Sequence, residues 1–254
     1  LGLEPGNVNA RVTLARALYL AGNPSGAAAQ LTEALGHDPK HALALYLKGV
    51  LLEEQGNTED ALDHYRRALD SEPDHGGAHH ALGNARMRLG DYRGALGHYA
   101  AAQAAVPQNA PAALMRAMAL VRLGPERHGE ARAVLESALR DHPEDAAIGL
   151  ALARLLAASP DAAVRDGSRA LVLAQGLFDR ANTLENAETL AMAQAETGDF
   201  AGAAALQNNA LVATAAAGRF GDLPRLQANL TLYQGGSPCR TPWLDQDPNF
   251  YPAP

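Results

Sequence analysis

Short apolar segments with helical spacing alternate along this chain with polar loops. In residues 61–71 (ALDHYRRALDS), small and large apolar residues recur at intervals of three and four, which places them on one face of a helix. Few windows alternate apolar and polar residues as half-buried strands do, and β-branched residues are sparse. The pattern therefore predicts an all-α protein.

The helical segments repeat at a fixed interval. Pro39, Pro73 and Pro107 lie 34 residues apart, and each closes a similar phrase (AAAQLTEALGHDP, ALDHYRRALDSEP, ALGHYAAAQAAVP). A fourth copy ends at Pro143 after a shift of two residues. A repeat of this length indicates a stack of helix pairs, which offers a long concave surface and seldom a buried reaction chamber.

Alignment of the repeats on these prolines, each set as position 32, gives small residues at positions 8, 20 and 27 and a larger one at position 24. Small residues let two helices approach closely, and the larger residue fills the gap beside them. Gly ends the first helix of each pair, and Asn or Asp begins the turn into the second. The aligned residues are Ala15, Gly49 and Gly83 at position 8, Ala27, Ala61 and Ala95 at position 20, Leu31, Tyr65 and Tyr99 at position 24, and Ala34, Ala68 and Ala102 at position 27.

This spacing, with its small residues, inter-helix glycine and terminal proline, resembles the tetratricopeptide repeat family. The resemblance implies a right-handed superhelical solenoid of antiparallel helix pairs, with about six units inside residues 1–234. We expect regular units over 8–143, irregular units over 144–218 and a capping helix over 222–234. Residues 235–254 contain five prolines and the only tryptophan, and we expect them to form an extended tail.

Composition narrows the classes of partner. Of the 254 residues 47% are apolar but only 5% aromatic, and the net charge is −7 with no basic stripe, which argues against nucleic acid as a partner. No apolar run is long enough to insert directly into a membrane. The first residues, LGLEP, resemble the end of an earlier repeat, so we expect a piece of a longer protein. No targeting signal is visible, and cytoplasmic and periplasmic locations both remain open.

The family resemblance also implies which residues face the concave groove, namely positions 2, 5, 9, 12 and 13 of the first helix in each pair. Asn can hydrogen-bond an extended backbone, Arg binds carboxylates, and Met and Tyr give adaptable apolar contact. This chemistry suits an extended peptide of acidic or apolar character. The expected groove residues are Arg16, Tyr19, Tyr46, Glu53, His80, Asn84, Met87, Arg88, Leu114, Met118, Arg122 and Arg154, and the irregular units add Leu150, Glu188, Met192 and Glu196.

The tail carries large apolar side chains on a segment with no helix of its own. Exposed side chains of Trp243, Phe250 and Tyr251 would form an apolar patch. Our hypothesis is therefore that they dock on the solenoid, either over the last helix or into a groove, the molecule's own or a neighbour's. Cys239 is the only cysteine, which excludes an internal disulfide and a cysteine-based zinc site. Two alternatives stay open for it: an inert thiol against the last helix, or a reactive exposed one.

Catalytic and metal-binding motifs are missing from the sequence. It has no nucleophile motif, phosphate loop or Gly-x-Gly-x-x-Gly, so we expect neither an enzyme nor a cofactor. His75 and His79 lie four residues apart, but the sequence places no third metal ligand near them. His41 and His75 occupy the same repeat position, which indicates a role in capping or in a loop.

The sequence therefore favours a non-catalytic scaffold that binds a polypeptide segment in its concave groove. One alternative is a recognition or assembly domain of a larger enzyme or export protein whose catalytic part lies outside this sequence. A second is a scaffold that assembles with its own copies through the repeat ends or the tail. A carboxylate clamp of the kind that some family members use needs Lys and Asn at positions 5 and 9, and only Asn84 matches it.

Overall fold

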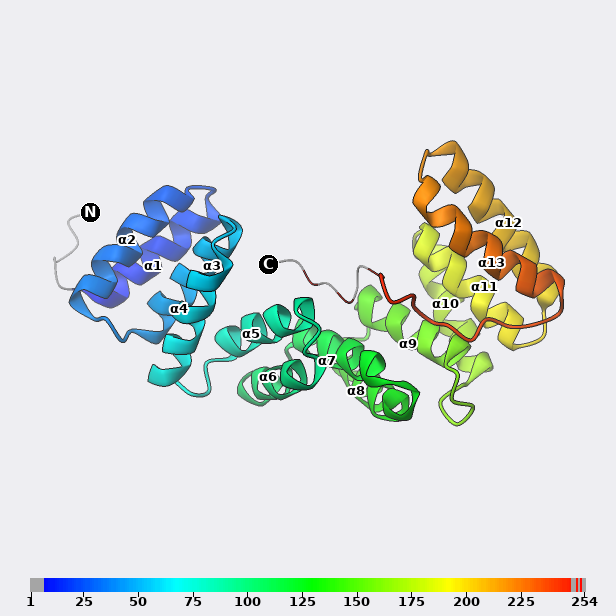
Figure 1. The fold of residues 1–254 in the computed structure, drawn as a ribbon, viewed down its shortest axis with the longest axis horizontal. Coiled ribbons are helices and arrows are strands. Elements are labelled where there is room, and N and C mark those ends of the chain that lie inside the picture. The colour runs from blue at the N-terminus through cyan, green and yellow to red at the C-terminus, as the bar shows by residue number, and fades with distance from the viewer. Residues whose placement is uncertain (1–6, 248–249, 251, 253–254) are drawn as a thin grey trace. The chain divides into compact units, whose positions relative to one another are not determined.

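The computed structural model describes residues 7–247, 250 and 252, and all the regular structure in them is helical (Figure 1). Successive helices pack against each other in pairs joined by short loops. This confirms the all-α fold of helix pairs that the sequence predicts. The chain divides into two compact units: unit 1 comprises residues 1–115 and 251–254, and unit 2 comprises residues 116–250. The boundary falls inside helix α7 (Ala110–Leu123).

Unit 1 contains the most regular helix pairs. We call the first helix of each pair its A helix and the second its B helix. The pairs are α1 (Val8–Leu20) with α2 (Pro24–His37), α3 (Ala42–Glu54) with α4 (Thr58–Ser71), and α5 (Gly76–Arg88) with α6 (Tyr92–Ala105).

The core of unit 1 repeats the aligned small and large positions. Tyr65 and Tyr99, at position 24 of their B helices, are 1% and 0% exposed. A methyl group added at Gly49 or Gly83, at position 8 of the A helices, would lie 2.5 or 2.6 Å from a carbon of the facing tyrosine ring. The glycines are therefore required because the tyrosine rings occupy the space of a side chain. In the first pair the same positions hold Ala15 and a leucine, which are also buried.

The loops of unit 1 contain the predicted helix-ending glycines and capping residues. Gly56 and Gly90 end A helices with φ of +80° and +76°, a conformation that favours glycine. Asp91 caps α6, because its carboxylate accepts a hydrogen bond from the Gly94 amide. His41 and His75 cap α3 and α5 through Nδ1, which confirms the capping role expected from their shared repeat position.

Unit 2 holds the irregular repeats. Its elements after α7 are η1 (Pro125–Arg127), α8 (His128–Asp141), α9 (Ala146–Ala158), α10 (Gly167–Arg180), α11 (Leu184–Glu196), α12 (Phe200–Ala216), η2 (Phe220–Asp222) and α13 (Leu223–Gln234). The short helix η1 occupies the longer loop of the fourth repeat. Helix α9 contacts α8, α10 and α11, and almost its whole surface is buried from Ile148 onward.

The end of unit 2 combines a helix with a non-helical segment. Helix α13 packs on α12, and the Gln207 side chain of α12 donates a hydrogen bond to the Leu226 carbonyl of α13 at 3.1 Å. After Gly236, with φ of +68°, the chain leaves the helix. It then runs without helix or strand past α13, α11 and α9 (Figure 1, red). We call the described residues 237–247 and Phe250 the tail segment.

Candidate functional site

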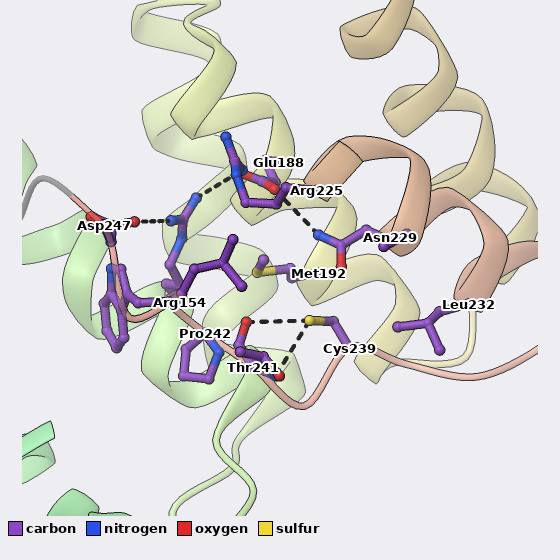
Figure 2. Close-up of a pocket in the computed structure, with 13 residues that line it drawn as sticks. Arg154, Glu188, Met192, Arg225, Asn229, Leu232, Cys239, Thr241, Pro242 and Asp247 are labelled. Carbon is purple, nitrogen blue, oxygen red and sulfur yellow. Dashed lines mark hydrogen bonds and ion pairs between the residues drawn. The ribbon is translucent and has the colours of Figure 1, made fainter. Parts of the chain in front are cut away.

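A buried group of charged side chains lies where the tail segment crosses the A helices of unit 2 (Figure 2). We call this surface, formed by side chains of α9, α11 and α13, the A-helix face of unit 2. Its centre is Glu188 on α11, whose side chain is 1% exposed. The Glu188 carboxylate accepts hydrogen bonds from Arg154 on α9, at 3.1 Å, and from Arg225 and Asn229 on α13.

Each charge in this group has a partner, as buried charges require. Arg154 also donates from Nε to the Thr189 hydroxyl at 3.1 Å, and Arg225 also pairs with Asp222 at 2.9 Å. Burial alone would lower the pKa of Arg225, but the carboxylates of Glu188 and Asp222 outweigh it and raise that pKa. The network fixes the position of the Arg154 guanidinium group.

The tail segment meets this face with opposite charges. Asp247 lies 3.8 Å from Nη1 of Arg154, and Asp245 pairs with Arg122 of α7. In the reverse sense, Arg240 of the tail pairs with Glu196 of α11. Carboxylates of the tail thus contact arginines of the helices, and the one arginine of the tail contacts a glutamate. The charges on the two surfaces are complementary.

Aromatic side chains of the tail segment are buried in unit 2. Trp243 is 8% and Phe250 2% exposed, and their ring centroids lie 6.3 Å apart in an edge-on arrangement. The Arg122 guanidinium carbon lies 4.9 Å from the centre of the Phe250 ring, within the range of a cation–π contact. Trp243 and Phe250 therefore lie against the helices, whereas Tyr251, the third aromatic residue of the docking hypothesis, lies outside the described residues.

A pocket of about 180 Å³ remains between the tail segment and the helices. Met192, Ala228 and Leu232 line it from α11 and α13, and Pro242, Trp243 and Leu244 line it from the tail (Figure 2). Polar side chains in its wall include Arg154, Glu188, Asn229 and Asp247. The pocket therefore combines apolar and charged surfaces.

Cys239 lies in the same region with 3% of its surface exposed. Its Sγ lies 3.4 Å from both the amide nitrogen and the carbonyl oxygen of Thr241. Burial raises the pKa of the thiol, which lowers the fraction of reactive thiolate. Of the two alternatives left open by the sequence, the structure favours the buried, inert thiol.

Unit 1 has a comparable A-helix face, formed by α1, α3 and α5. Glu53 on α3 is 7% exposed, and its carboxylate accepts a hydrogen bond from the Tyr65 hydroxyl at 2.8 Å and pairs with Arg88 on α5. Tyr19 on α1 donates to Glu54 in a similar way. The Arg88–Glu53 and Tyr19–Glu54 contacts each join neighbouring A helices at a separation of 35 residues. The Arg154–Glu188 contact of unit 2 joins two A helices in the same way, at a separation of 34 residues.

Two tetratricopeptide repeat family models match the chain, over residues 12–76 and 52–119. Residues 12–119 are therefore tetratricopeptide repeats. This repeat family is typically non-catalytic, and the match indicates a protein-interaction module. No curated protein sequence matches the chain.

Several solved tetratricopeptide repeat structures are similar to the chain. PilF of Pseudomonas aeruginosa superimposes with a TM-score of 0.65 at 19% identity, over 90% of this chain and 95% of PilF. PilW, described as a type IV pilus biogenesis factor, gives 0.63 at 19% identity over 80% and 91%. YrrB, described as having an unusual peptide-binding site, gives 0.63 at 18% identity over 81% and 96%. At these identities the likeness shows the fold alone.

The sequence-predicted groove residues of the repeat protein lie in different environments. Arg16 is exposed on α1, and Leu114 is half-buried on α7. Met87 and Met118 are 0% and 1% exposed, so their side chains lie in the helix packing. Met118, Arg122 and Arg154 belong to unit 2, and the others lie in unit 1.

Three residues of the predicted set, on α3 and α5, lie beside the rings of other side chains. The Tyr46 ring lies 5.0 Å from the His75 ring and 5.9 Å from the Tyr65 ring. The Asn84 Oδ1 accepts a hydrogen bond from Tyr99 at 2.9 Å, which leaves the amide nitrogen of Asn84 as a donor. The Nε2 atom of His80 is buried without a hydrogen-bond partner, and burial lowers the pKa of this histidine.

Sequence reasoning missed the residues that complete the unit 2 face. Arg225 and Asn229 lie on α13, which the sequence predicts only as a cap, and Asp247 lies in the tail. Arg225 follows Glu188 by 37 residues, so an approximate continuation of the repeat would have identified it. For Asp247 the sequence gives no periodic signal.

His79 contacts the Pro73 carbonyl and His98 through its two ring nitrogens, at 2.9 and 3.0 Å. Within the described ranges no three His, Cys, Asp or Glu side chains are placed to hold a metal ion. Among those same residues, none of the helices combines the length and hydropathy needed to cross a bilayer.

Proposed function

We propose that this protein binds an extended polypeptide segment on the A-helix faces of its repeats. One observation carries the proposal: residues 237–247, themselves a non-helical stretch of polypeptide, lie along the A-helix face of unit 2. They are held by paired charges and by the buried Trp243 side chain. A surface that accommodates its own chain in this way has the chemistry to accommodate another.

The face of unit 1 supports the same class of ligand. Arg16 offers an exposed guanidinium group, and Asn84 offers the amide nitrogen that its hydrogen bond with Tyr99 leaves as a donor. Donors of this kind match the carbonyl oxygens of an extended backbone and the carboxylates of acidic side chains. The peptide-binding site named for YrrB, a protein of the same fold, is consistent with this use of the surface. The proposal assigns no reaction to the protein.

An exposed arginine on each type of helix allows a matched test. Arg16 lies on an A helix and Arg93 on the B helix α6, and both are exposed. Arg88 is unsuitable, because reversing its charge would leave the buried Glu53 carboxylate beside a second negative charge. The full chain is screened on an array of immobilised 15-residue peptides, and the affinity of the best acidic binder is then measured by fluorescence anisotropy.

We expect Arg16→Glu to weaken this binder about fivefold, the size of effect typical of a charge at the rim of an interface, whereas Arg93→Glu leaves the affinity unchanged. Circular dichroism checks that both variants keep the helical content of the parent. Equal losses for the two variants would place the ligand elsewhere on the molecule. An array with no binder at all would refute peptide binding.

A further inference from the structure

We infer that the tail segment is an internal ligand of unit 2, and that the face it covers selects segments carrying an aromatic residue followed four positions later by an acidic one. In the tail itself, the aromatic residue is Trp243 and the acidic residue is Asp247. The inference rests on the proposed function, and it names the class of partner and the means by which binding on unit 2 is regulated.

The acidic preference follows from the surroundings of Arg154. Its Nη2 and Nε atoms are occupied by Glu188 and Thr189, and its Nη1 atom faces Asp247 of the tail. Glu188 is shared with Arg225, which also pairs with Asp222, so on the face alone Arg154 has only a share of one carboxylate. The Arg154 side chain is only 6% exposed, and a neutral group in place of Asp247 would leave its charge poorly compensated.

The two tail carboxylates differ in their contribution to selection. The Asp245 side chain is 92% exposed beside Arg122, whereas the Asp247 side chain is 15% exposed beside Arg154. Exposed ion pairs contribute little, because water and salt screen them. The acidic position that matters is therefore that of Asp247, four residues after the aromatic side chain.

The aromatic preference follows from the burial of Trp243 among the pocket residues. A buried tryptophan supplies a large contact area and is the kind of side chain that dominates binding energy at interfaces. The facing wall includes Met192, whose flexible thioether side chain adapts to rings of different shape. The face is thus expected to accept other aromatic residues in the place of Trp243.

The tail segment fills this face incompletely, which makes it displaceable. A pocket of about 180 Å³ stays open between it and the helices, and Leu232 and Leu244 at the rim remain 40% and 47% exposed. Apolar side chains that line this pocket therefore stay partly in contact with water, which a bulkier side chain would displace. A partner segment with a bulkier side chain at this point would bury more surface than the tail does. The tethering of the tail raises its local concentration and protects the face from weak competitors.

The test uses a synthetic peptide of residues 237–250 in which the cysteine is replaced by serine. Trp243 is the only tryptophan of the chain, so the full-length variant Trp243→Ala/Asp247→Asn contains none. Tryptophan emission in a mixture of this variant and the peptide therefore comes from the peptide alone. A dye on the peptide N-terminus gives the affinity for every chain by anisotropy. Ser237→Ala/Gln246→Ala is the matched control, because both residues are exposed on the docked tail and neither lines the pocket.

We expect the peptide emission to shift to the blue on binding to Trp243→Ala/Asp247→Asn, with an affinity at least tenfold higher than for the wild type and the control. Peptides lacking the tryptophan or the second aspartate should bind at least tenfold more weakly. Should the double variant lose its helical circular dichroism, Asp247→Asn alone takes its place, with anisotropy as the readout.

Two results would overturn the inference. A folded variant that fails to bind the peptide would show that the face does not select such segments. A wild-type chain that dimerises with concentration, and loses this on Trp243→Ala, would make a second copy the occupant. If array peptides still bind in an Arg16-dependent manner, only this inference fails; if no peptide binds anywhere, the proposed function fails as well.

Discussion

Individual residues in this protein are constrained in pairs. Gly83 and Tyr99 face each other across α5 and α6, and the tyrosine ring occupies the space that any side chain at position 83 would need. The Tyr99 hydroxyl in turn holds the Asn84 side chain on the A-helix face. Packing between the helices of a pair thus determines the orientation of a polar group on the surface where we propose that a ligand binds.

Gly83→Ala should destabilise the protein, by about 1–3 kcal/mol, because the added methyl group overlaps the buried Tyr99 ring. Gly97→Ala is the control: it lies in the middle of α6 with open space around it, so it should stabilise by up to about 1 kcal/mol through helix propensity alone. Urea unfolding followed by circular dichroism measures both. Adding Tyr99→Leu should make the cost of Gly83→Ala smaller; a cost that stays the same would contradict the steric explanation.

Among the helices and loops, those that recur every 34 residues were predictable from the sequence, and the contacts of α13 and of the tail were not. The 34-residue period predicted which helices pair, because Gly, Ala and Tyr recur at positions where volume decides the packing. The period predicted the residues of the A-helix face only in part, because Met87 fits the period and yet its side chain lies in the core. The period fails between α11 and α13, where the 17-residue helix α12 and the short η2 lengthen the spacing to 37 residues. The tail lies outside any period, so its contacts depend on tertiary structure alone.

The tail segment should behave as an element that opens independently of the helices. Cys239 is 3% exposed, so a thiol reagent can reach it only when the tail leaves the face. We expect Asp247→Asn to raise the rate of Cys239 modification severalfold at unchanged helical content, because it removes a carboxylate from the buried Arg154. The exposed Gln246→Ala serves as the control. Equal rates for the two variants, measured with a chromogenic disulfide reagent, would show that this ion pair does not hold the tail.

At the scale of the whole chain, stability should decrease on mild acidification. Burial lowers the pKa of His80 and His98 in unit 1 and of His128 in unit 2, for His98 to about 4 from an ordinary 6.5. Below pH 6.5 the unfolded chain therefore binds protons that the folded chain excludes. The free energy of unfolding consequently decreases as the pH is lowered. Well above pH 6.5 these histidines are neutral in both states, so they do not contribute to the pH dependence of the unfolding free energy.

This pH dependence can be isolated at one residue. Urea midpoints of the wild type should fall between pH 7 and pH 5, and those of His98→Gln should fall less, because glutamine cannot take up a proton. His37→Gln is the comparison, since His37 is an exposed histidine at the end of α2. If His98→Gln and the wild type lose stability in parallel, another group accounts for the acid sensitivity.

The matched residues between A and B helices also restrict how such a gene can recombine. Ala15 faces Leu31, whereas Gly83 faces Tyr99. A crossover in the loop between the two helices of a pair would place an alanine against a tyrosine, and the new pair would be overpacked. A crossover at the proline that ends each pair keeps both partners together. Duplications and exchanges that preserve folding should therefore begin and end at these prolines, and the conserved unit of inheritance would be the helix pair.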